Sequence, residues 1–336
     1  MSRKLITIST IMTLMSTSVI ADVPNVAADI SPIHSLVSRV MDGVGAPKLI
    51  VQSGVSPHGY RLRPSEAKAL QDADHVFWMG EELTPWLDSA IDTLATKASV
   101  TTLLDQEGII LHDFREGALF EAHDHSAHGD DDHDDHDDHD DHKDHDDHDD
   151  HDDHDDHKDH DDHDDHGSHD PHAWLSAENA KLWLNIIASK LSVSDPENAA
   201  TYFMNAAAGQ AEIEAMIAEV KATLKPVQGG KFVVFHDAYQ YFENDFDFYA
   251  SGAISLGDSS DPSPARIEKV QKRIRDEGIQ CVLAEPQFKK GLVATVMEGS
   301  DATASVIDPL GTELETGPKL YTQLIENMAK TLRNCL

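Results

Sequence analysis

The chain has 336 residues, enough for two ordinary domains, and 62 acidic against 26 basic side chains give it a net charge of −36 at pH 7. A protein this acidic is not a nucleic-acid binder and is poorly suited to an anionic membrane face. Net charge speaks mainly to solubility, but this charge suits a cationic ligand.

The first 21 residues have the form of a cleaved secretory signal. Arg3 and Lys4 give a positive start, an apolar stretch covers residues 5–20, and Ala21 ends it with a small side chain. The stretch is shorter than the about 20 apolar residues of a membrane span, and Thr and Ser interrupt it. We therefore expect cleavage after Ala21 and an exported mature protein.

Residues 22–121 alternate between helical and strand patterns. The predicted elements are a helix at 30–44, a strand at 48–52, a helix at 64–73, a strand at 75–79, a helix at 84–96 and a strand at 100–104. Pro64 in a first turn, with Glu66 close behind, marks a helix start. This alternation implies a parallel sheet with helices on both faces, here an N-terminal α/β lobe.

Residues 122–169 form the plainest break in composition. They contain 24 Asp, 16 His and 2 Lys, and so carry −22 of the total charge. From His133 to His166 a histidine falls at every third position. With almost no apolar residues the segment cannot bury a core, so we predict an insertion that is disordered without metal.

Residues 170–192 are predicted to hold a loop and a linking helix that starts at an N-cap, Ser176. Residues 193–336 return to strand-helix alternation. The predicted elements are a helix at 195–224, a strand at 231–235, a helix at 238–244, a strand at 253–256, a helix at 264–277, a strand at 280–285, a helix at 292–299, a strand at 305–307 and a helix at 318–334. The predicted fold class is therefore α/β, with two similar lobes, each a mostly parallel sheet flanked by helices. Ligands bind beyond the carboxyl ends of such strands, which is the cleft between the lobes.

Six histidines lie outside the insertion, and three of them stand where a ligand would arrive. His58 follows a strand of the first lobe, His172 precedes the linking helix, and His236 directly follows a strand of the second lobe. Three neutral imidazoles suit Zn²⁺, Cu²⁺ or Ni²⁺ better than Ca²⁺ or Mg²⁺. Asp308, which also follows a strand, or water could supply a fourth ligand. The spacing alone leaves open that each histidine is merely a solvated loop residue.

Of the remaining histidines outside the insertion, His34 and His75 are interpreted as packing or surface residues, and His112, close to the insertion, as an exposed residue. Glu285 follows a strand, and two interpretations of it stay open. It could hold a ligand imidazole through the second ring nitrogen, or it could be a structural charge.

The chain has two cysteines, Cys281 and Cys335. In an exported protein such a pair favours a disulfide, which would fasten the C-terminal end to a strand. Closing a loop of this size is worth roughly 4 kcal/mol in the chain-entropy picture. The alternative is a pair of unpaired buried thiols.

Five segments along the chain carry a resemblance to a known family. They are Ser53-Gly54-Val55-Ser56-Pro57-His58-Gly59-Tyr60 followed by Leu62-Arg63-Pro64-Ser65, Asp170-Pro171-His172-Ala173-Trp174-Leu175-Ser176, Phe235-His236-Asp237-Ala238-Tyr239-Gln240-Tyr241-Phe242, Ala284-Glu285-Pro286-Gln287-Phe288, and Ile307-Asp308-Pro309-Leu310-Gly311. In this order they resemble the signatures of the periplasmic zinc-binding proteins of ABC transporters. The match covers essentially the whole mature chain, and a histidine-rich insertion is also a feature of zinc members.

The resemblance implies two α/β lobes joined by a rigid helix, with the metal between them. The family's three histidines fall on His58, His172 and His236. Its C-terminal aspartate falls on Asp308 and is a ligand in some members and only a neighbour in others. Members that carry manganese or iron usually place a carboxylate where His236 stands, which favours zinc here. The two cysteines fall where some zinc members form a disulfide.

The chain departs from the family at one place. Some zinc members have Glu immediately before the first histidine and Asp after it, whereas this chain has Pro57 and Gly59. A carboxylate ligand beside His58 is therefore absent, which favours Asp308 or water as the fourth partner.

The insertion is predicted to bind metal as an accessory collector, because imidazoles are largely neutral near pH 7 and aspartates attract cations. The accessory ligands would be His133, His136, His139, His142, His145, His148, His151, His154, His157, His160, His163 and His166. Each site should be weak, because binding must order a flexible chain. The alternative is a solvated acidic spacer.

The predicted function is a monomeric periplasmic substrate-binding protein that captures Zn(II) with high affinity and does no chemistry. It would deliver the ion to a membrane ABC permease with its cytoplasmic ATPase. Because the ligands must be neutral, affinity should fall as the pH drops through about 6.5. The alternatives are an extracytoplasmic metal buffer or adhesin, a manganese- or nickel-binding homologue, and a zinc hydrolase. Against the hydrolase, the sequence has no HExxH helix and no obviously placed general base.

Overall fold

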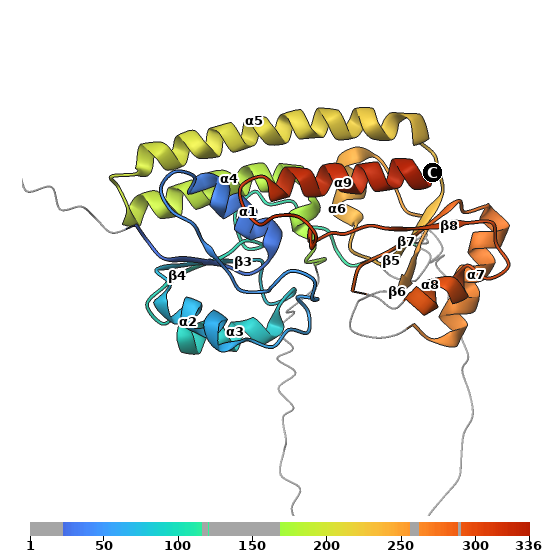
Figure 1. Cartoon of the computed structure of the whole chain (residues 1–336), viewed down its shortest axis with the longest axis horizontal. Helices are drawn as coiled ribbons and strands as arrows, with labels where there is room; N and C mark the ends of the chain where they lie inside the picture. The colour runs from blue at the N-terminus through green and yellow to red at the C-terminus, as the bar shows by residue number, and fades with distance from the viewer. Residues whose placement is uncertain (1–22, 116–119, 121–168, 256–261, 288–289) are drawn as a thin grey trace, which may run out of the picture.

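The computed structural model describes residues 23–115, 120, 169–255, 262–287 and 290–336. The predicted signal peptide, the accessory histidines from His133 to His166 and the rest of the insertion up to residue 168 lie outside the described residues. Within them the chain forms two α/β lobes side by side, with long helices running across the top of both (Figure 1).

The N-terminal lobe is built on a four-stranded parallel sheet with the strand order β2-β1-β3-β4. Its elements are β1 (Val26–Ala28), α1 (Ser31–Val40), β2 (Lys48–Leu49), α2 (Pro64–Asp72), β3 (His75–Trp78), α3 (Pro85–Leu94) and β4 (Ser99–Thr102). α2 begins as the sequence predicts, because Glu66 reaches back and accepts the backbone N–H of Arg63 at 2.7 Å. The strand β1 was not predicted, although it lies at the centre of this sheet.

The C-terminal lobe repeats the pattern with a second parallel sheet of strand order β6-β5-β7-β8. Its elements are β5 (Phe232–His236), α6 (Gln240–Phe246), β6 (Ala253–Ser255), α7 (Pro264–Glu277), β7 (Cys281–Ala284), α8 (Lys290–Val296), β8 (Thr303–Val306) and α9 (Leu320–Cys335). The prediction of two similar parallel-sheet lobes is therefore confirmed.

The described part of the chain between the two sheets is largely helical. It forms the 3₁₀ turn η2 (Ala173–Leu175), α4 (Ala177–Ser194), α5 (Ala199–Leu224) and the 3₁₀ turn η3 (Lys225–Val227), which leads on to β5. Ser176 caps α4 as predicted, because its hydroxyl accepts the N–H of Asn179 at 3.3 Å. The predicted linking helix corresponds to α4, which packs on α1 of one lobe and α6 of the other. The longer α5 follows it and runs along both lobes (Figure 1).

One continuous apolar core joins the two lobes. It contains the inner faces of both sheets together with buried residues of α1, α4, α5, α6 and α9. Two smaller clusters seal the outer faces, one beneath α2 and α3 and the other beneath α7 and α8. Because interiors are packed to crystal-like density, a core shared in this way resists a wide hinge motion between the lobes.

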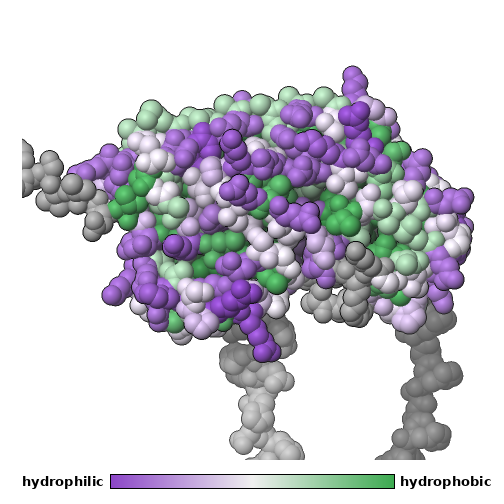
Figure 2. All heavy atoms as spheres, in the orientation of Figure 1, coloured by the Kyte–Doolittle hydropathy of each residue, from purple (hydrophilic) through white to green (hydrophobic). Residues whose placement is uncertain are grey.

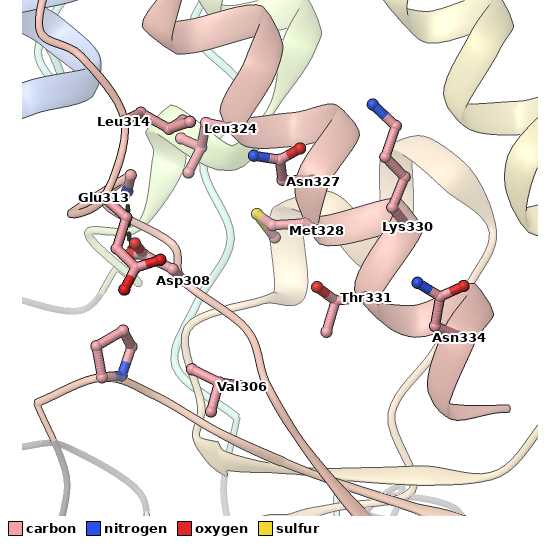
Figure 3. Close-up of a pocket in the computed structure, with 12 residues that line it drawn as sticks. Val306, Asp308, Glu313, Leu314, Leu324, Asn327, Met328, Lys330, Thr331 and Asn334 are labelled. Carbon is pink, nitrogen blue, oxygen red and sulfur yellow. Dashed lines mark hydrogen bonds between the residues drawn. The ribbon is translucent and has the colours of Figure 1, made fainter.

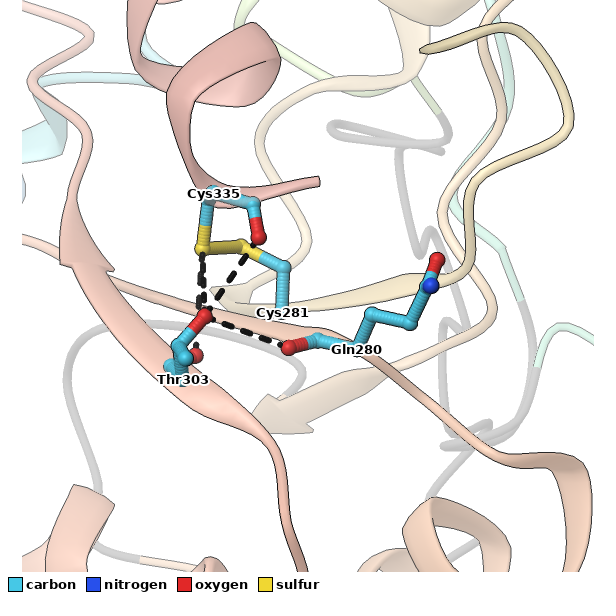
Figure 4. The surroundings of a disulfide bond; sticks show 4 residues. All are labelled: Gln280, Cys281, Thr303 and Cys335. Carbon is cyan, nitrogen blue, oxygen red and sulfur yellow. Dashed lines mark hydrogen bonds between the residues drawn. A yellow bond between two sulfur atoms is a disulfide. The ribbon is translucent and has the colours of Figure 1, made fainter.

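Cys281 and Cys335 form a disulfide that ties the first residue of β7 to the last residue of α9 (Figure 4). The bridge therefore fastens the C-terminal end of the chain to a strand, as predicted. It lies at the amino ends of the parallel strands, opposite the edge where a ligand would bind.

Hydrophilic residues spread over the face shown in Figure 2, and apolar residues appear between them in scattered patches. None of the described helices is long and apolar enough to cross a membrane.

Candidate metal centre

The carboxyl edge of the C-terminal sheet carries two of the residues singled out in the sequence. His236 is the last residue of β5, and Glu285 directly follows the end of β7. These strands are neighbours, and the chain order reverses between them because β6 lies on one side of β5 and β7 on the other. Such a switch point is where ligands bind in open parallel sheets.

Glu285 holds the imidazole of His236. The Nδ1 atom of His236 lies 2.5 Å from Oε1 of Glu285, and both side chains are almost completely buried. The second carboxylate oxygen accepts from Nε2 of Gln287 at 2.8 Å. Of the two interpretations left open for Glu285, the structure therefore supports the one in which it orients an imidazole.

Asp170 plays the same part for His172, which caps the N-terminus of η2. The Oδ1 atom of Asp170 lies 2.6 Å from Nδ1 of His172 and accepts its backbone N–H at 3.0 Å. Both side chains are buried. The ring of His172 is further enclosed by Trp174, with ring centroids 5.2 Å apart.

The two rings face each other through their remaining nitrogens. Because a carboxylate only accepts hydrogen bonds, each Nδ1 carries the proton, and Nε2 of a neutral ring presents a lone pair. The Nε2 atoms of His172 and His236 lie 3.4 Å apart. Two nitrogens bound to one tetrahedral Zn²⁺ at 2.0–2.1 Å would be separated by about 3.3–3.4 Å. The pair is thus already spaced for a single ion.

His58 is the third ring of the cluster and lies on the loop between β2 and α2. Its ring centroid is 5.5 Å from that of His172. The loop is anchored by Trp86 of α3, whose indole N–H donates to the carbonyl of Pro57 at 2.7 Å. His58 is half-buried, unlike the other two rings. Among the described residues, no group of three or more His, Cys, Asp or Glu side chains is arranged so that it could hold a metal ion.

Asp308, the fourth predicted ligand, uses its carboxylate within its own turn. One oxygen accepts the N–H groups of Leu310 and Gly311 at 3.0 Å, and the other accepts the N–H and hydroxyl of Thr312 at 2.5 and 2.7 Å. The residue also lines a pocket of about 670 Å³ between β8 and α9, beside Glu313 (Figure 3). These four bonds compete with any role as a metal ligand.

The surroundings of the rings are strongly acidic. Asp170, Asp237 and Glu285 are all buried there, with exposed fractions of 1, 7 and 2%. Burial raises the pKa of Asp237, and the paired guanidinium of Arg115 opposes that shift. Burial, reinforced by the nearby Glu285 and Asp308, raises the pKa of Tyr239 well above its ordinary value, so its hydroxyl stays protonated. The field favours a cation between the rings.

The other histidines take no part in this cluster. His34 is buried beside the carbonyl of Pro47, and His75 stacks on Phe77 and bonds the hydroxyl of Ser194 at 2.6 Å. His112 is half-buried against another aromatic ring. The interpretation of His34 and His75 as packing or surface residues is confirmed, whereas His112, expected to be exposed, is half-buried.

Sequence reasoning missed three residues around the site: Arg115, the ring-orienting role of Asp170, and Tyr241. For Asp170 a signal existed, since an Asp two positions before a candidate ligand can bond its ring. The other two have partners more than 70 residues away, and no local pattern indicates them.

A family model described as "Zinc-uptake complex component A periplasmic" matches residues 26–335. The chain belongs to this family.

Similar proteins support the assignment. The chain is 50% identical over 311 residues to the high-affinity zinc uptake system protein ZnuA of Brucella abortus (strain 2308), covering 93% of this chain and 91% of that protein. It is 46% identical over 317 residues to the ZnuA of Paracoccus denitrificans (strain Pd 1222), covering 94% and 93%. A crystal structure of a ZnuA superposes with a TM-score of 0.70 at 18% identity over 94% of this chain and 99% of that one, which shows the shared fold.

Proposed function

We propose that the protein captures Zn²⁺ in the periplasm through His58, His172 and His236 and delivers it to an ABC permease driven by a cytoplasmic ATPase. The observation that carries the proposal is the opposed Nε2 pair of His172 and His236, buried and 3.4 Å apart. Membership of the zinc-uptake family and the names of its relatives support zinc as the cargo.

Zn²⁺ would bind at a site in which two of the three proposed ligands are already in position. The rings of His172 and His236 are fixed by Asp170 and Glu285, so little entropy is lost when they take up the ion. The loop of His58 then closes by a small shift, because the shared core opposes a wider motion of the lobes. Zn²⁺ accepts the resulting geometry because it has no d-electron preference.

Water or Asp308 would fill the fourth position. Water is the better candidate, because Asp308 would have to give up hydrogen bonds within its turn to reach a metal. A water ligand also exchanges easily, which would help the ion to leave when the protein docks on the permease.

A hydrolytic zinc site would need a general base near that water. The buried carboxylates of Asp170 and Glu285 each already accept a hydrogen bond from a ligand imidazole, and Tyr239 stays protonated. We therefore propose a binding protein and not an enzyme. Turnover of simple esters or bicarbonate that disappears in His172→Ala would contradict this.

The remaining parts keep the roles expected from the sequence. We propose a lobe at 22–121, an accessory metal-collecting insertion at 122–169, a ligand loop and linking helix at 170–192, a second lobe at 193–336, and a monomeric mature protein released from a signal peptide of 21 residues. The insertion could feed zinc to the three histidines of the proposed site or only buffer metal. The two roles can be tested separately, because the ligands of the insertion are distinct from those three histidines.

Growth under zinc limitation tests the function in a cell. In a bacterium that lacks its own zinc-uptake binding protein, the wild-type gene should restore growth in chelator-treated medium, and added zinc should make the gene dispensable. The His172→Ala variant, exported to an equal level, should fail. Equal rescue by the variant would reject the proposed ligands, and rescue of manganese-limited but not zinc-limited growth would reject zinc as the cargo.

A further inference from the structure

The two chain segments that flank the insertion are paired beside the metal centre. The backbone N–H of Asp170 donates to the carbonyl of His112 at 2.7 Å, and Asp113 and His169 form an antiparallel bridge. The ring of His169 also lies 3.0 Å from the carboxylate of Asp113. We call this pair, residues 112–115 with 169–170, the stem. It ends two residues before His172.

Helix α6 of the C-terminal lobe holds the stem through Tyr241. The buried phenol hydroxyl donates to the carbonyl of Asp170 at 2.7 Å and accepts the backbone N–H of His112 at 3.0 Å. A single side chain thus contacts both strands of the stem. The position of Asp170, and of the ring that it holds, is thereby set relative to α6.

Arg115 makes the second attachment. Its Nε lies 3.0 Å from both carboxylate oxygens of Asp237, its Nη2 bonds Asp237 as well, and its Nη1 donates to Glu243 at 2.5 Å. Both acids are buried, and the ring of Phe120 lies 3.6 Å from the guanidinium carbon. The nearby Arg266 instead donates to carbonyls of β6.

Asp237 directly follows His236. We propose that Arg115 is a positioning residue for the metal site: it fixes the peptide that follows His236 to the stem that leads into His172, and so keeps the two imidazoles in register. This inference rests on the proposed zinc-binding function. Arg115 does not touch the ion; it acts through Asp237 on one ring and through the stem on the other.

The chemistry of the guanidinium makes this role specific. Its planar fork can hold two carboxylates in fixed directions, whereas the ammonium of Lys is a point charge that fixes no direction. Without Arg115, two buried carboxylates would face each other without a bonded cation, and both would move toward water. That movement would pull on the residue after His236.

The test compares variants of the full mature chain in zinc competition against a chelator, with Co²⁺ absorption spectra as a report on ligand number and geometry. Arg115→Ala should weaken zinc binding at least about tenfold, the scale seen when outer partners of metal-ligating histidines are removed. Its Co²⁺ spectrum should also change. Arg115→Lys should fall between Ala and wild type, because it restores the charge but not the fork.

Arg39→Ala is the matched control. Arg39 is also a poorly exposed arginine in a two-bond pair, with Glu212, but it joins α1 to α5 outside the metal centre. It should lower the melting temperature without changing zinc affinity or the Co²⁺ spectrum. If Arg39→Ala weakens zinc binding as much as Arg115→Ala, general destabilisation explains the effect and the proposal fails.

A triple variant separates the positioning effect of Arg115 from the effect of its positive charge. Arg115→Ala combined with Asp237→Asn and Glu243→Gln removes the negative charges that would otherwise be unpaired, but it does not restore the planar fork of the guanidinium. The zinc affinity of the triple variant should therefore stay low. Recovery to the wild-type value would overturn the proposal, as would an unchanged affinity in Arg115→Ala. Absence of a tight site in the wild-type chain would instead contradict the zinc-binding function itself.

Discussion

His172 and His236 are 64 residues apart in the chain, yet their Nε2 atoms face each other at 3.4 Å inside the protein. Each ring is fixed by a buried carboxylate that bonds its Nδ1 atom, so the Nε2 lone pairs of the two neutral rings point toward each other. Such an arrangement is unfavourable by itself and becomes favourable when a cation enters. We therefore expect the opposed pair to favour a cation between the two rings.

The three proposed ligands should not contribute equally. His172→Ala or His236→Ala removes a buried, pre-positioned ligand, and the loss of zinc affinity should exceed the about 10- to 100-fold cost of losing an outer partner. His58→Ala should cost less, because that half-buried ring must move before it binds. Chelator competition measures all three. A larger loss in His58→Ala than in His172→Ala would contradict the pre-formed pair.

The variant Glu285→Gln tests the carboxylate that bonds Nδ1 of His236. Glu285→Gln can still accept from Nδ1, but a neutral amide makes Nε2 less basic, so zinc affinity should fall by about 10-fold and up to 100-fold. Glu313→Gln, an exposed carboxylate in the pocket between β8 and α9, is the control and should bind like wild type. Equal affinities for the two variants would show that Glu285 has only a structural role.

Asp308→Asn distinguishes the two candidates for the fourth ligand. An amide offers one acceptor oxygen where the turn uses two, so the free energy of unfolding should fall by roughly 1–3 kcal/mol. If water is the fourth ligand, zinc affinity measured by competition should change less than about tenfold. A loss as large as that of His172→Ala would identify Asp308 as a ligand.

A buried acid in the first lobe should make stability depend on pH. Asp29, completely buried, accepts the N–H groups of Ile30 and Met79 at 2.7 Å, and burial raises its pKa to about 7. Between about pH 4 and 7 the folded state therefore binds a proton that the unfolded state releases. This contribution lowers stability as the pH rises through that window, by at most about 1.4 kcal/mol per pH unit.

Urea unfolding in the presence of a chelator, from pH 5 to 7, measures this slope. The Asp29→Asn variant should be less stable overall, because its NH₂ group would face a backbone N–H, but it should lack the contribution of Asp29 to the slope. Parallel pH profiles for the variant and the wild type would show that Asp29 stays ionised throughout the window.

The disulfide should stabilise the fold without affecting the site. It closes a separation of 54 residues, so the paired change Cys281→Ala with Cys335→Ala should cost roughly 4 kcal/mol in the free energy of unfolding. Zinc affinity should stay within about twofold, because the bridge lies at the amino end of β7 and Glu285 follows its carboxyl end. Weaker zinc binding in proportion to lost stability would mean that strand β7 transmits strain to the site.

Most of the fold follows from the local pattern of the sequence, with particular exceptions. The helix α7 has the bounds that its pattern predicts, and the other predicted elements occur with ends shifted by a few residues. β1 was missed because three residues, Val-Ala-Ala, are too short to show alternation and two of them have little strand preference. Its burial at the centre of a sheet is a tertiary effect.

The site was predictable only in part. The rule that ligands meet the carboxyl ends of parallel strands indicated His58 and His236, and a place at a helix entry indicated His172. The family motifs then placed the three in one site. Arg115 carries no such signal, because its partners Asp237 and Glu243 lie 122 and 128 residues further along the chain. Only folding brings these three charges together, so local sequence patterns cannot reveal them.

We expect tight zinc binding at His58, His172 and His236 and not in the insertion. Calorimetric titration of the mature protein without residues 122–169, against a competing chelator, tests it most directly. We predict one tight zinc site that is lost in His172→Ala and His236→Ala. Absence of a tight site in the shortened protein would contradict the account and would assign the metal binding to the insertion.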